Sequence, residues 1–532
     1  MTKAPVAAAI TAEPVWKPKY NHWLVGAVVS IAAFMEVLDT SIANVALPHI
    51  AGNMGATNSD STWVLTSYLA ANAIVLPVTG WFTQIFGRKR FFLICILMFT
   101  ASSFLCGLAP SLGVLLLARV LQGGFGGGLQ PMAQAIMKDS FPADQQGHAF
   151  ALYGISAIVG PAVGPVLGGW LTDNYSWRWI FYINIPMGLL ALVLVSQLVE
   201  DPPASRKKIV DFSRLDYLGF GFLAIGIAAL QIVLDKGQED DWFGSHFIVA
   251  LSITAVVCLT ALVIWEYYQK HPVVDVRLFR DWHFSACNVM MFVLGIVIYG
   301  CAVLLPQMLQ TLMGYTAMVA GFVMSGGAIC LILCFPIAGK LTNKYPAKYI
   351  MACGWVCMTL GMVFSFSGAD LQMSFGAAAK LRIVQYVPIS IIFVPLTVVS
   401  YVGLSATKNN EAAGLLAFTR NMGGSVGTSI VTTVLSRRMQ FHQSILAQHT
   451  RSTHVTMATK ALAMHFNHAG MGHYDAHKSA VAGLYQMIQA QAYMLSYLDC
   501  YWVFGVTTAA MLVIALLIKK NNPKAARSVP AH

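Results

Sequence analysis

Two acidic residues, Glu36 and Asp39, lie inside an apolar segment that is long enough to cross a membrane, residues 23–45. A carboxylate at bilayer depth costs on the order of 2.5–3.5 kcal/mol on insertion scales, so it is rarely kept without a use. The i, i+3 spacing places both side chains on one face of a helix. Paired carboxylates in a poorly solvated site titrate as a coupled unit. This is the chemistry of a proton-carrying site, and we predict Asp39 as the main carrier, assisted by Glu36.

A third charged residue, Arg119, lies in a separate apolar segment, residues 112–134. An arginine at this depth needs a buried acid or a ligand carboxylate as its counter-ion. The alternative is a structural arginine that is held by backbone carbonyl groups. Three polar residues in apolar segments are candidates for the lining of a substrate cavity: Gln122 in 112–134, and Tyr68 and Asn72 in 62–82.

The composition requires lipid around most of the chain. Of its 532 residues, 57% are hydrophobic and 10% are charged, whereas soluble domains have about 25% charged residues. Mean hydropathy is +0.65. Apolar stretches of about 18–25 residues recur along the sequence and predict an all-α membrane protein of about fourteen helices. We place these helices near 23–45, 62–82, 91–108, 112–134, 147–171, 179–198, 215–234, 246–268, 284–305, 318–339, 349–366, 381–403, 412–434 and 498–518.

The net charge of +11 sets the orientation of the chain and calls for no nucleic acid partner. If the N-terminus is cytoplasmic, most Lys and Arg residues fall in cytoplasmic segments such as 88–90 and 206–208, as the positive-inside rule expects. The short outer loops hold only Arg178, Lys236, Lys380 and Arg382. Both termini are therefore predicted to be cytoplasmic. The polar, proline-containing first 20 residues do not resemble a cleavable signal peptide.

Two further groups of residues have structural interpretations. Arg420 lies near the inner end of segment 412–434 and is followed by Gly423, Gly424 and Gly427, which is typical of helix packing beside a snorkelling arginine. The ten cysteines lie in or beside apolar segments without partnering acids or histidines, so they are interpreted as small membrane-core residues. No metal site and no cofactor are predicted.

The second half of the sequence weakly repeats the first. Residues 45–48, 80–83 and 119–122 match 303–306, 339–342 and 382–385 in order and at a nearly constant offset. A parallel repeat of six-helix halves is the signature of a rocking transporter. We therefore predict an N-terminal bundle over 1–200, two inserted helices over 201–280, and a C-terminal bundle over 281–532. Asp39 has no acidic counterpart, because its equivalent position falls near Val297, so proton chemistry is expected mainly in the first half.

One long hydrophilic stretch, residues 436–497, interrupts the second half and faces outward in this topology. It is rich in histidine, and His473, Asp475 and His477 have side chains of types that bind metal ions. The spacing is irregular, however, which favours a solvated helical cap or a docking surface. The other histidines of this stretch are His442, His449, His454, His465 and His468.

Several motifs together resemble the fourteen-helix drug:proton antiporter family of the major facilitator superfamily. Residues 35–48 resemble the first-helix signature of that family, and residues 80–90 resemble its loop motif. Residues 117–123 resemble its helix-4 motif, and residues 160–169 resemble its helix-5 antiporter motif. Further similarities lie at 235–242, 272–279 and 418–427. The resemblance covers most of the chain, and the set of motifs is specific although each member alone is not.

The resemblance implies roles for several residues. The arginine equivalent to Arg119 takes part in proton coupling in the family, which would place it near Asp39 and Glu36. The loop motif, with Gly80, Gly87, Arg88 and Lys89, helps to latch the cytoplasmic side, although simple positive-inside anchoring also explains its charges. The family usually has an aspartate where this chain has Gln84, so a latch built on that acid is in doubt here. Gln84 can form hydrogen bonds but cannot switch with protonation.

The helix-5 motif also has a physical interpretation. Gly160, Gly164 and Gly168 are spaced i, i+4, i+8 and make a smooth face that allows close helix approach. We predict that this face packs between the two halves of the protein. Pro161 and Pro165 kink or stiffen the helix, and Gly169 completes the motif.

The leading hypothesis is export of small amphipathic compounds, driven by proton influx through a bacterial inner membrane. One alternative is a proton-coupled importer, a symporter of the same architecture that moves compound and proton in the same direction. An integral membrane enzyme is the alternative from another class, but the sequence has no H-E-x-x-H, G-x-S-x-G, P-loop or dinucleotide motif. The resemblance further implies a tripartite system, in which an EmrA-type periplasmic adaptor docks on 436–497 and a TolC-type outer-membrane channel lies beyond it.

Overall fold

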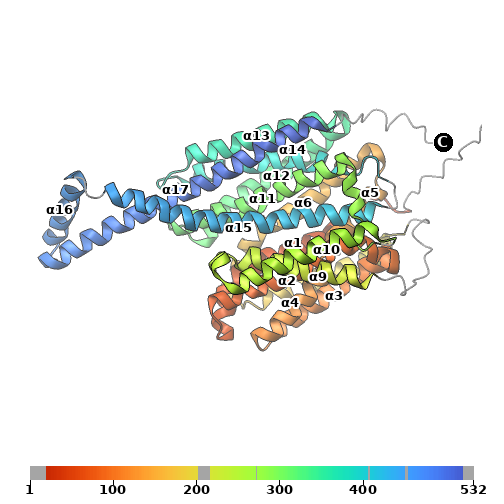
Figure 1. The fold of residues 1–532 in the computed structure, drawn as a ribbon, viewed down its shortest axis with the longest axis horizontal. Helices are drawn as coiled ribbons and strands as arrows, with labels where there is room; N and C mark the ends of the chain where they lie inside the picture. Colours follow the sequence, from red (N-terminus) through yellow and green to blue (C-terminus); the bar gives the residue numbers. More distant parts are fainter. Residues whose placement is uncertain (1–18, 202–215, 271, 405–407, 450–452, 519–532) are drawn as a thin grey trace, which may run out of the picture.

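The structure of the chain is a computed structural model that describes residues 19–201, 216–270, 272–404, 408–449 and 453–518 (Figure 1). Over these residues the chain forms helices joined by short connections, with no strand among them. Thirteen helical segments are long and apolar enough to cross a membrane, since about 20 residues at 1.5 Å each span the hydrocarbon core. The prediction of an all-α, multi-pass membrane protein is confirmed.

The N-terminal half consists of six spans. They are built by α1 (His22–Met54), α2 (Asn58–Phe86), α3 (Arg88–Leu108), α4 (Leu112–Gly126) with α5 (Leu129–Ser140), α6 (Gln146–Asn174), and α7 (Trp179–Tyr182) with α8 (Asn184–Leu198). Local sequence explains the boundaries of the first two. Helix α1 ends at Gly55, which adopts the left-handed conformation with φ +62°. Helix α2 begins with a capping box formed by Thr57 and Asp60.

The remaining spans form the inserted pair and the C-terminal half. The inserted helices are α9 (Tyr217–Lys236) and α10 (His246–Tyr268), and the C-terminal half contains α11 (Trp282–Thr311), α12 (Ala317–Lys344), α13 (Ala347–Gly368), α14 (Phe375–Ser400), α15 (Asn409–His449) and α17 (His473–Leu517). Helix α15 is less apolar than the thirteen spans but runs through the bundle against α11, α2 and α5. With α15 included, the helix count agrees with the predicted fourteen.

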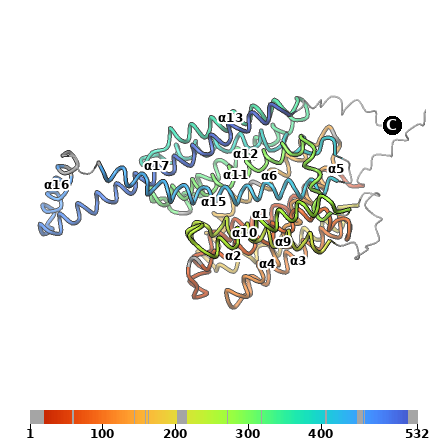
Figure 2. The backbone as a smooth tube through the Cα atoms, in the orientation of Figure 1, coloured from red at the N-terminus to blue at the C-terminus, as the bar shows by residue number. Residues whose placement is uncertain are grey.

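The two halves meet along two helix pairs, α6 with α12 and α2 with α15. Figure 2 shows α12, α13 and α17 on one side of the bundle and α2, α3 and α4 on the other. The inserted helix α9 packs against α10, α2 and α15, and the Ser425 hydroxyl on α15 donates to Gln231 on α9 at 3.0 Å. The insertion therefore covers the outside of the α2–α15 contact between the halves.

The described part of the predicted outer loop at 436–497 is mainly helical. It comprises the end of α15, the short helix α16 (Thr453–His468) and the start of α17. We call this projection the hairpin, and it extends beyond the bundle in Figures 1 and 2. At its base Asp499 of α17 accepts hydrogen bonds from Arg438 Nε at 2.5 Å and from His442 Nε2 at 2.8 Å. Among the described residues no group of three or more His, Cys, Asp and Glu side chains is placed to hold a metal ion.

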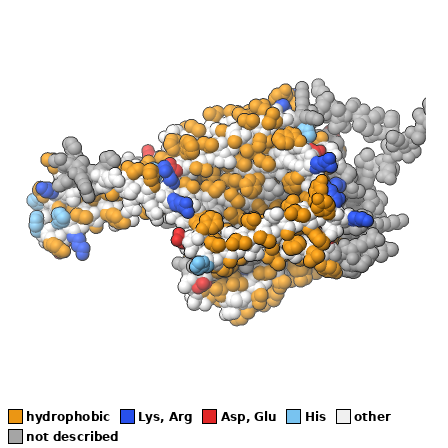
Figure 3. All heavy atoms as spheres, in the orientation of Figure 1, with side chains coloured by type: hydrophobic (Ala, Val, Ile, Leu, Met, Phe, Trp, Pro, Cys, Tyr) orange, Lys and Arg blue, Asp and Glu red, His pale blue; other side chains and the backbone are white. Residues whose placement is uncertain are grey.

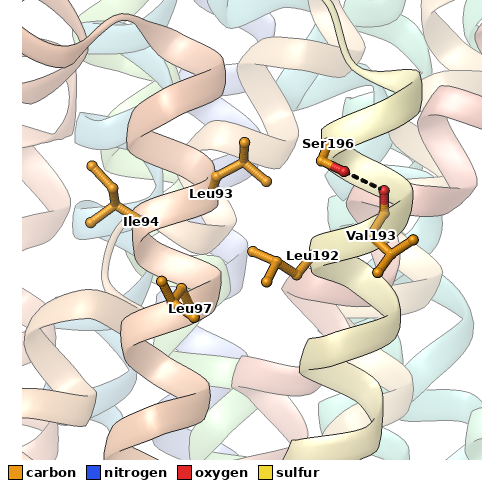
Figure 4. Close-up of a pocket in the computed structure, with 6 residues that line it drawn as sticks. All are labelled: Leu93, Ile94, Leu97, Leu192, Val193 and Ser196. Carbon is orange, nitrogen blue, oxygen red and sulfur yellow. Dashed lines mark hydrogen bonds between the residues drawn. The ribbon is translucent and has the colours of Figure 1, made fainter.

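The surface follows the expected membrane pattern. Figure 3 shows hydrophobic side chains along the side of the bundle, whereas charged residues and histidines gather toward its ends and on the hairpin. A shallow apolar groove lies between α3 and α8 (Figure 4) and is lined by Leu93, Ile94, Leu97, Leu192, Val193 and Ser196. The Ser196 hydroxyl donates to the Val193 carbonyl at 2.7 Å. The groove therefore offers lipid contact and no free polar anchor.

The glycine face of α6 corrects one prediction. Gly160, Gly164 and Gly168 pack against Val37, Ser41 and Ile42 of α1, inside the N-terminal half, and not between the halves. Close approach is indeed their role, because a Cβ at any of the three would crowd α1. Pro161 and Pro165 lie inside α6, and Gly169 has open space around it. The contact between the halves uses other α6 residues, among them Gly147, which meets Gly339 of α12.

Candidate functional site

Asp39 is the centre of a buried polar cluster in the N-terminal half. Its Oδ2 atom accepts a hydrogen bond from Arg119 Nη1 at 2.6 Å. Its Oδ1 atom accepts from Gln122 Nε2 at 2.9 Å and from Asn184 Nδ2 at 2.7 Å. The Asp39 and Arg119 side chains are 1% and 0% exposed. A buried ion pair is tolerated only when hydrogen bonds satisfy its remaining atoms, and here three donors surround one carboxylate.

A second layer of contacts holds the arginine in place. Arg119 Nη1 also donates to Gln122 Oε1 at 2.7 Å, and Nε donates to the Val64 carbonyl at 3.0 Å. The guanidinium lies over the Tyr68 ring, 4.2 Å from its centroid. The Ser103 hydroxyl accepts from Gln122 and from Asn184 at 3.1 and 3.0 Å. The i, i+3 spacing of Arg119 and Gln122 on α4 lets both reach Asp39, whereas Asn184 and Ser103 come from α8 and α3 and were not predicted.

Glu36 forms a separate cluster one turn earlier on α1. Its carboxylate accepts from Tyr68 OH at 3.3 Å, from Asn72 Nδ2 at 3.0 Å, and from Gln130 Nε2 of α5. The structure thus brings Arg119 and Gln122 to Asp39, and Tyr68 and Asn72 to Glu36. Glycines permit this closeness, because a Cβ at Gly123 or Gly127 would overlap the backbone carbonyl oxygens of α2.

Arg420 corrects a second prediction. It does not snorkel to the membrane surface but is 4% exposed and points from α15 into the N-terminal half. Its Nη2 donates to Gln130 Oε1, and its Nη1 donates to Tyr153 OH at 3.4 Å. Arg420 therefore reaches the Glu36 cluster from the other half of the protein.

The C-terminal half contains a matching cluster without an acid. Arg382 was assigned to an outer loop, but it is fully buried in α14, where Nη1 donates to the Cys301 carbonyl at 3.0 Å and to Gln385 at 3.3 Å. Gln385 donates to Ser365 at 3.1 Å, as Gln122 does to Ser103. No described carboxylate pairs with Arg382, which instead contacts the Tyr386 hydroxyl. The contacts of Arg382 with Gln385 and of Gln385 with Ser365 thus repeat those of the Arg119 cluster in the first half. No described carboxylate takes the place of Asp39.

Polar contacts between the halves gather at the end of the bundle opposite the hairpin, which we call the latch end. Asp139 of α5 pairs with Arg88 at 2.6 Å and accepts from Asn409 Nδ2 of α15 at 2.8 Å. Gln84 Nε2 donates to Glu411 Oε1 at 2.9 Å, and Asn343 accepts from the Gly147 amide at 3.0 Å.

The loop-motif residues surround this latch end. Gly80 lies against Glu411 with no room for a Cβ, and Gly87 has φ +80°, which favours glycine. Lys89 contacts Asp201 through its amide at 2.8 Å and the Ser196 carbonyl through Nζ at 2.6 Å. The polar Gln84 thus joins the halves in place of the usual aspartate.

Replacing Gln84 by aspartate is expected to weaken the latch end, although it restores the usual family residue. The new carboxylate would face Glu411, and like charges at contact distance repel. The distance between labels at the latch ends of α2 and α12 should shift toward longer values. Gln84→Asn, which keeps a neutral amide, is the control. A shorter distance between the labels in Gln84→Asp than in Gln84→Asn would contradict the expectation.

Arg119→Lys is expected to damage function far more than folding. Lysine keeps the positive charge beside Asp39 but loses the planar fork that also holds Gln122 and the Val64 carbonyl. The apparent melting temperature should fall by less than about 5 °C, while proton movement coupled to substrate falls about tenfold or more. Arg382→Lys is the matched control, since Arg382 is equally buried but faces no acid. Equal losses in the two variants would show that Arg119 has only a packing role.

Comparison with known proteins agrees with this fold. Residues 29–428 match the family model described as Major Facilitator Superfamily. The chain is 36% identical over 491 residues to the multidrug export protein EmrB of Haemophilus influenzae, covering 92% of this chain and 94% of that protein. It is 36% identical over 423 residues to the fatty acid resistance protein FarB of Neisseria gonorrhoeae, covering 79% and 82%. The solved structure of the proton:xylose symporter XylE shares 13% identity at a TM-score of 0.61, covering 94% and 97%, and so shows the common fold.

Proposed function

The chain belongs to the Major Facilitator Superfamily, and we propose that it is a proton-coupled multidrug exporter that works by alternating access. The observation that carries the proposal is the buried ion pair of Asp39 and Arg119. Its relatives include a multidrug export protein and a fatty acid resistance protein, which supports export of small amphipathic compounds. We assign the chain to a bacterial inner membrane with both termini, and the latch end, in the cytoplasm.

The geometry suggests how a proton would act at this site. An ionised Asp39 accepts from Arg119, Gln122 and Asn184, which ties α1 to α4 and α8. A protonated Asp39 has no charge and gains an O–H donor, so it satisfies fewer of these donors. Arg119 then loses its counter-ion, and the three helices are free to adjust their packing. Proton entry from outside would in this way favour the state that next opens to the cytoplasm.

The energy available is sufficient for pumping. One proton moving down a potential of 100 mV releases roughly 2.3 kcal/mol. Tyr68, Asn72 and Gln122 remain our candidates for the cavity lining, because Tyr68 and Asn72 of α2 contact Glu36 and Gln122 of α4 contacts Asp39.

The direct test is purified protein in proteoliposomes with an internal pH dye. Adding an amphipathic compound on the side of the latch end should cause proton release on that side as the compound moves across. A coupled importer would move compound and proton in the same direction, and a membrane enzyme would consume the compound without proton flux. Either result would overturn the proposal.

The hairpin supports a tripartite assembly. It projects from the end of the bundle opposite the latch end (Figure 1), and in the proposed orientation this is the side on which an exporter releases its cargo. Its solvent-facing surface has large apolar side chains, and exposed methionine and tyrosine are typical of protein-binding surfaces. These side chains are Met457, Met464, Met471, Tyr474, Tyr485 and Met487. The proposed partners are an EmrA-like periplasmic adaptor on the hairpin and a TolC-like outer-membrane channel beyond it.

A further inference from the structure

Gln130 of α5 stands between an acid of one half and an arginine of the other. Its side-chain NH₂ group donates to Glu36 of α1, and its carbonyl oxygen accepts from Arg420 of α15. Tyr153 OH also donates to that oxygen, at 3.1 Å. Gln130 and Glu36 are 2% and 3% exposed, so water does not substitute for these contacts.

The two ends of this amide are not interchangeable. A carboxylate only accepts hydrogen bonds, and a guanidinium only donates them. An ionised Glu36 therefore requires the NH₂ end of Gln130, and Arg420 requires the oxygen end. The orientation that satisfies Glu36 is the same orientation that binds Arg420, so the acid and the contact between the halves are coupled through one side chain.

Glu36 is surrounded by few other charges. Asp39 lies on the same helix with its own partner Arg119, and Arg420 is the cation that faces Glu36 from the C-terminal half. Among the described residues, the other titratable groups near it are three tyrosine hydroxyls, those of Tyr68, Tyr153 and Tyr299. A change of charge at Glu36 therefore reaches the C-terminal half mainly through Gln130 and Arg420.

We propose that Gln130 is a proton-sensing relay, whose amide turns when Glu36 is protonated and then releases Arg420 and the C-terminal half. This proposal rests on the proposed proton-coupled export and deepens it. An ionised Glu36 accepts from three donors, Tyr68, Asn72 and Gln130. A protonated Glu36 carries an O–H donor and loses acceptor capacity. The Gln130 oxygen can then accept a hydrogen bond from the O–H of Glu36. This turn of the amide points the Gln130 NH₂ group at the Arg420 guanidinium. Because both groups only donate, the hydrogen bond between Gln130 and Arg420 is lost.

The direction of the effect follows from the state of the structure. The halves are joined at the latch end, and Arg420 is bound through Gln130. Loss of the Arg420 contact weakens this closed arrangement. A proton on Glu36 therefore favours opening at the latch end, where the proton is released in the proposed cycle.

The same helix supplies a matched control. Gln134 lies one turn further along α5, is 1% exposed, and accepts from Tyr401 OH of the C-terminal half at 3.5 Å. It therefore also joins α5 to the other half through a buried amide, but no acid contacts it among the described residues. Replacing Gln134 therefore removes one contact between α5 and the C-terminal half but leaves the contacts of Gln130 with Glu36 and Arg420 in place.

The test follows the distance between the halves in the full protein in nanodiscs, as a function of pH. Fluorophores attached through unnatural amino acids at Phe86 and Tyr345, both exposed at the latch end, leave the native cysteines in place. Between about pH 8 and pH 5 the open-to-closed ratio of the wild type and of Gln134→Leu should rise about tenfold or more on acidification. In Gln130→Leu the rise should be at least about threefold smaller than in Gln134→Leu, because Asp39 still responds to pH but the relay from Glu36 is absent.

Two results would overturn the relay. One is a pH response in Gln130→Leu equal to that of Gln134→Leu, and the other is a wild-type ratio that does not respond to pH. If Gln130→Leu does not fold, Glu36→Gln carries the test, because a permanently neutral residue should raise the open-to-closed ratio at pH 8 toward its value at pH 5. Substrate-evoked proton release is measured on the same samples. Its presence without the relay behaviour refutes the relay alone, and its absence in the wild type refutes the proposed function.

Discussion

Asp39→Asn is expected to reduce substrate-evoked proton release to less than about 1% of the wild-type rate. Asparagine has the shape of aspartate and can accept from Gln122 and Asn184, but it cannot carry a proton. The measurement is proton release in proteoliposomes on addition of an exported compound, at matched protein amounts. Normal release in this variant would show that Asp39 is not the carrier.

A loss of folding must be separated from a loss of proton transfer. Asp39→Asn leaves Arg119 buried without a counter-ion, and breaking a buried pair from one side costs about 3–5 kcal/mol. The double variant Asp39→Asn, Arg119→Gln removes both charges and should recover most of the thermal stability. It should remain unable to couple substrate to protons. Recovery of proton release in the double variant would assign Asp39 a structural role only.

Shortening the hairpin is expected to abolish resistance in whole cells while pumping by the purified protein survives. Residues 446–488 would be replaced by a short Gly/Ser linker, which keeps the Arg438–Asp499 contact at the base. The membrane helices are not expected to depend on the tip, because in the described part of the chain α16 packs against α17. Proteoliposome transport should stay within about twofold of wild type, whereas co-purification with the adaptor should be lost.

A second variant tests the surface of the hairpin without changing its length. This variant replaces four exposed apolar side chains by serine, those of Met457, Met464, Tyr474 and Met487. Such side chains would form the buried centre of an interface. Adaptor binding should fall with this variant as it does with the shortened one. Adaptor recovery at the wild-type level from both variants would place the docking surface elsewhere on the protein.

The sequence predicted the parts of the site that break a local rule. Glu36, Asp39 and Arg119 are charges inside apolar segments, and such charges are visible without any knowledge of the fold. Gln122 was named only as a candidate for the cavity lining, and the family motifs supplied the expected meeting of Arg119 with Asp39. The helix count followed from the lengths of the apolar runs, because lipid requires each spanning segment to satisfy its own backbone.

The parts that sequence reasoning missed depend on contacts between distant segments. Asn184 and Ser103 are neutral polar residues, which are common in membrane helices and give no signal of a shared carboxylate. Arg420 lies near the end of its apolar run, where a snorkelling arginine is the usual interpretation. Only the packing of α15 against α2 and α5 turns it inward. Likewise, the spacing of Gly160, Gly164 and Gly168 showed a close contact but could not identify α1 as the partner.

The arginine cluster without an acid, around Arg382, limits the electrical work of each transport cycle. The described buried residues of the C-terminal half include Arg382 and Arg420 but no carboxylate. If Glu36 and Asp39 carry the protons of the proposed cycle, at most two protons return in each cycle. Export of a neutral compound is then electrogenic and responds to voltage. Exchange of one proton for a monovalent cation moves no net charge and draws on the pH difference alone. At 100 mV, one proton supports a concentration ratio of roughly 50 for a neutral compound and two protons roughly 2,000.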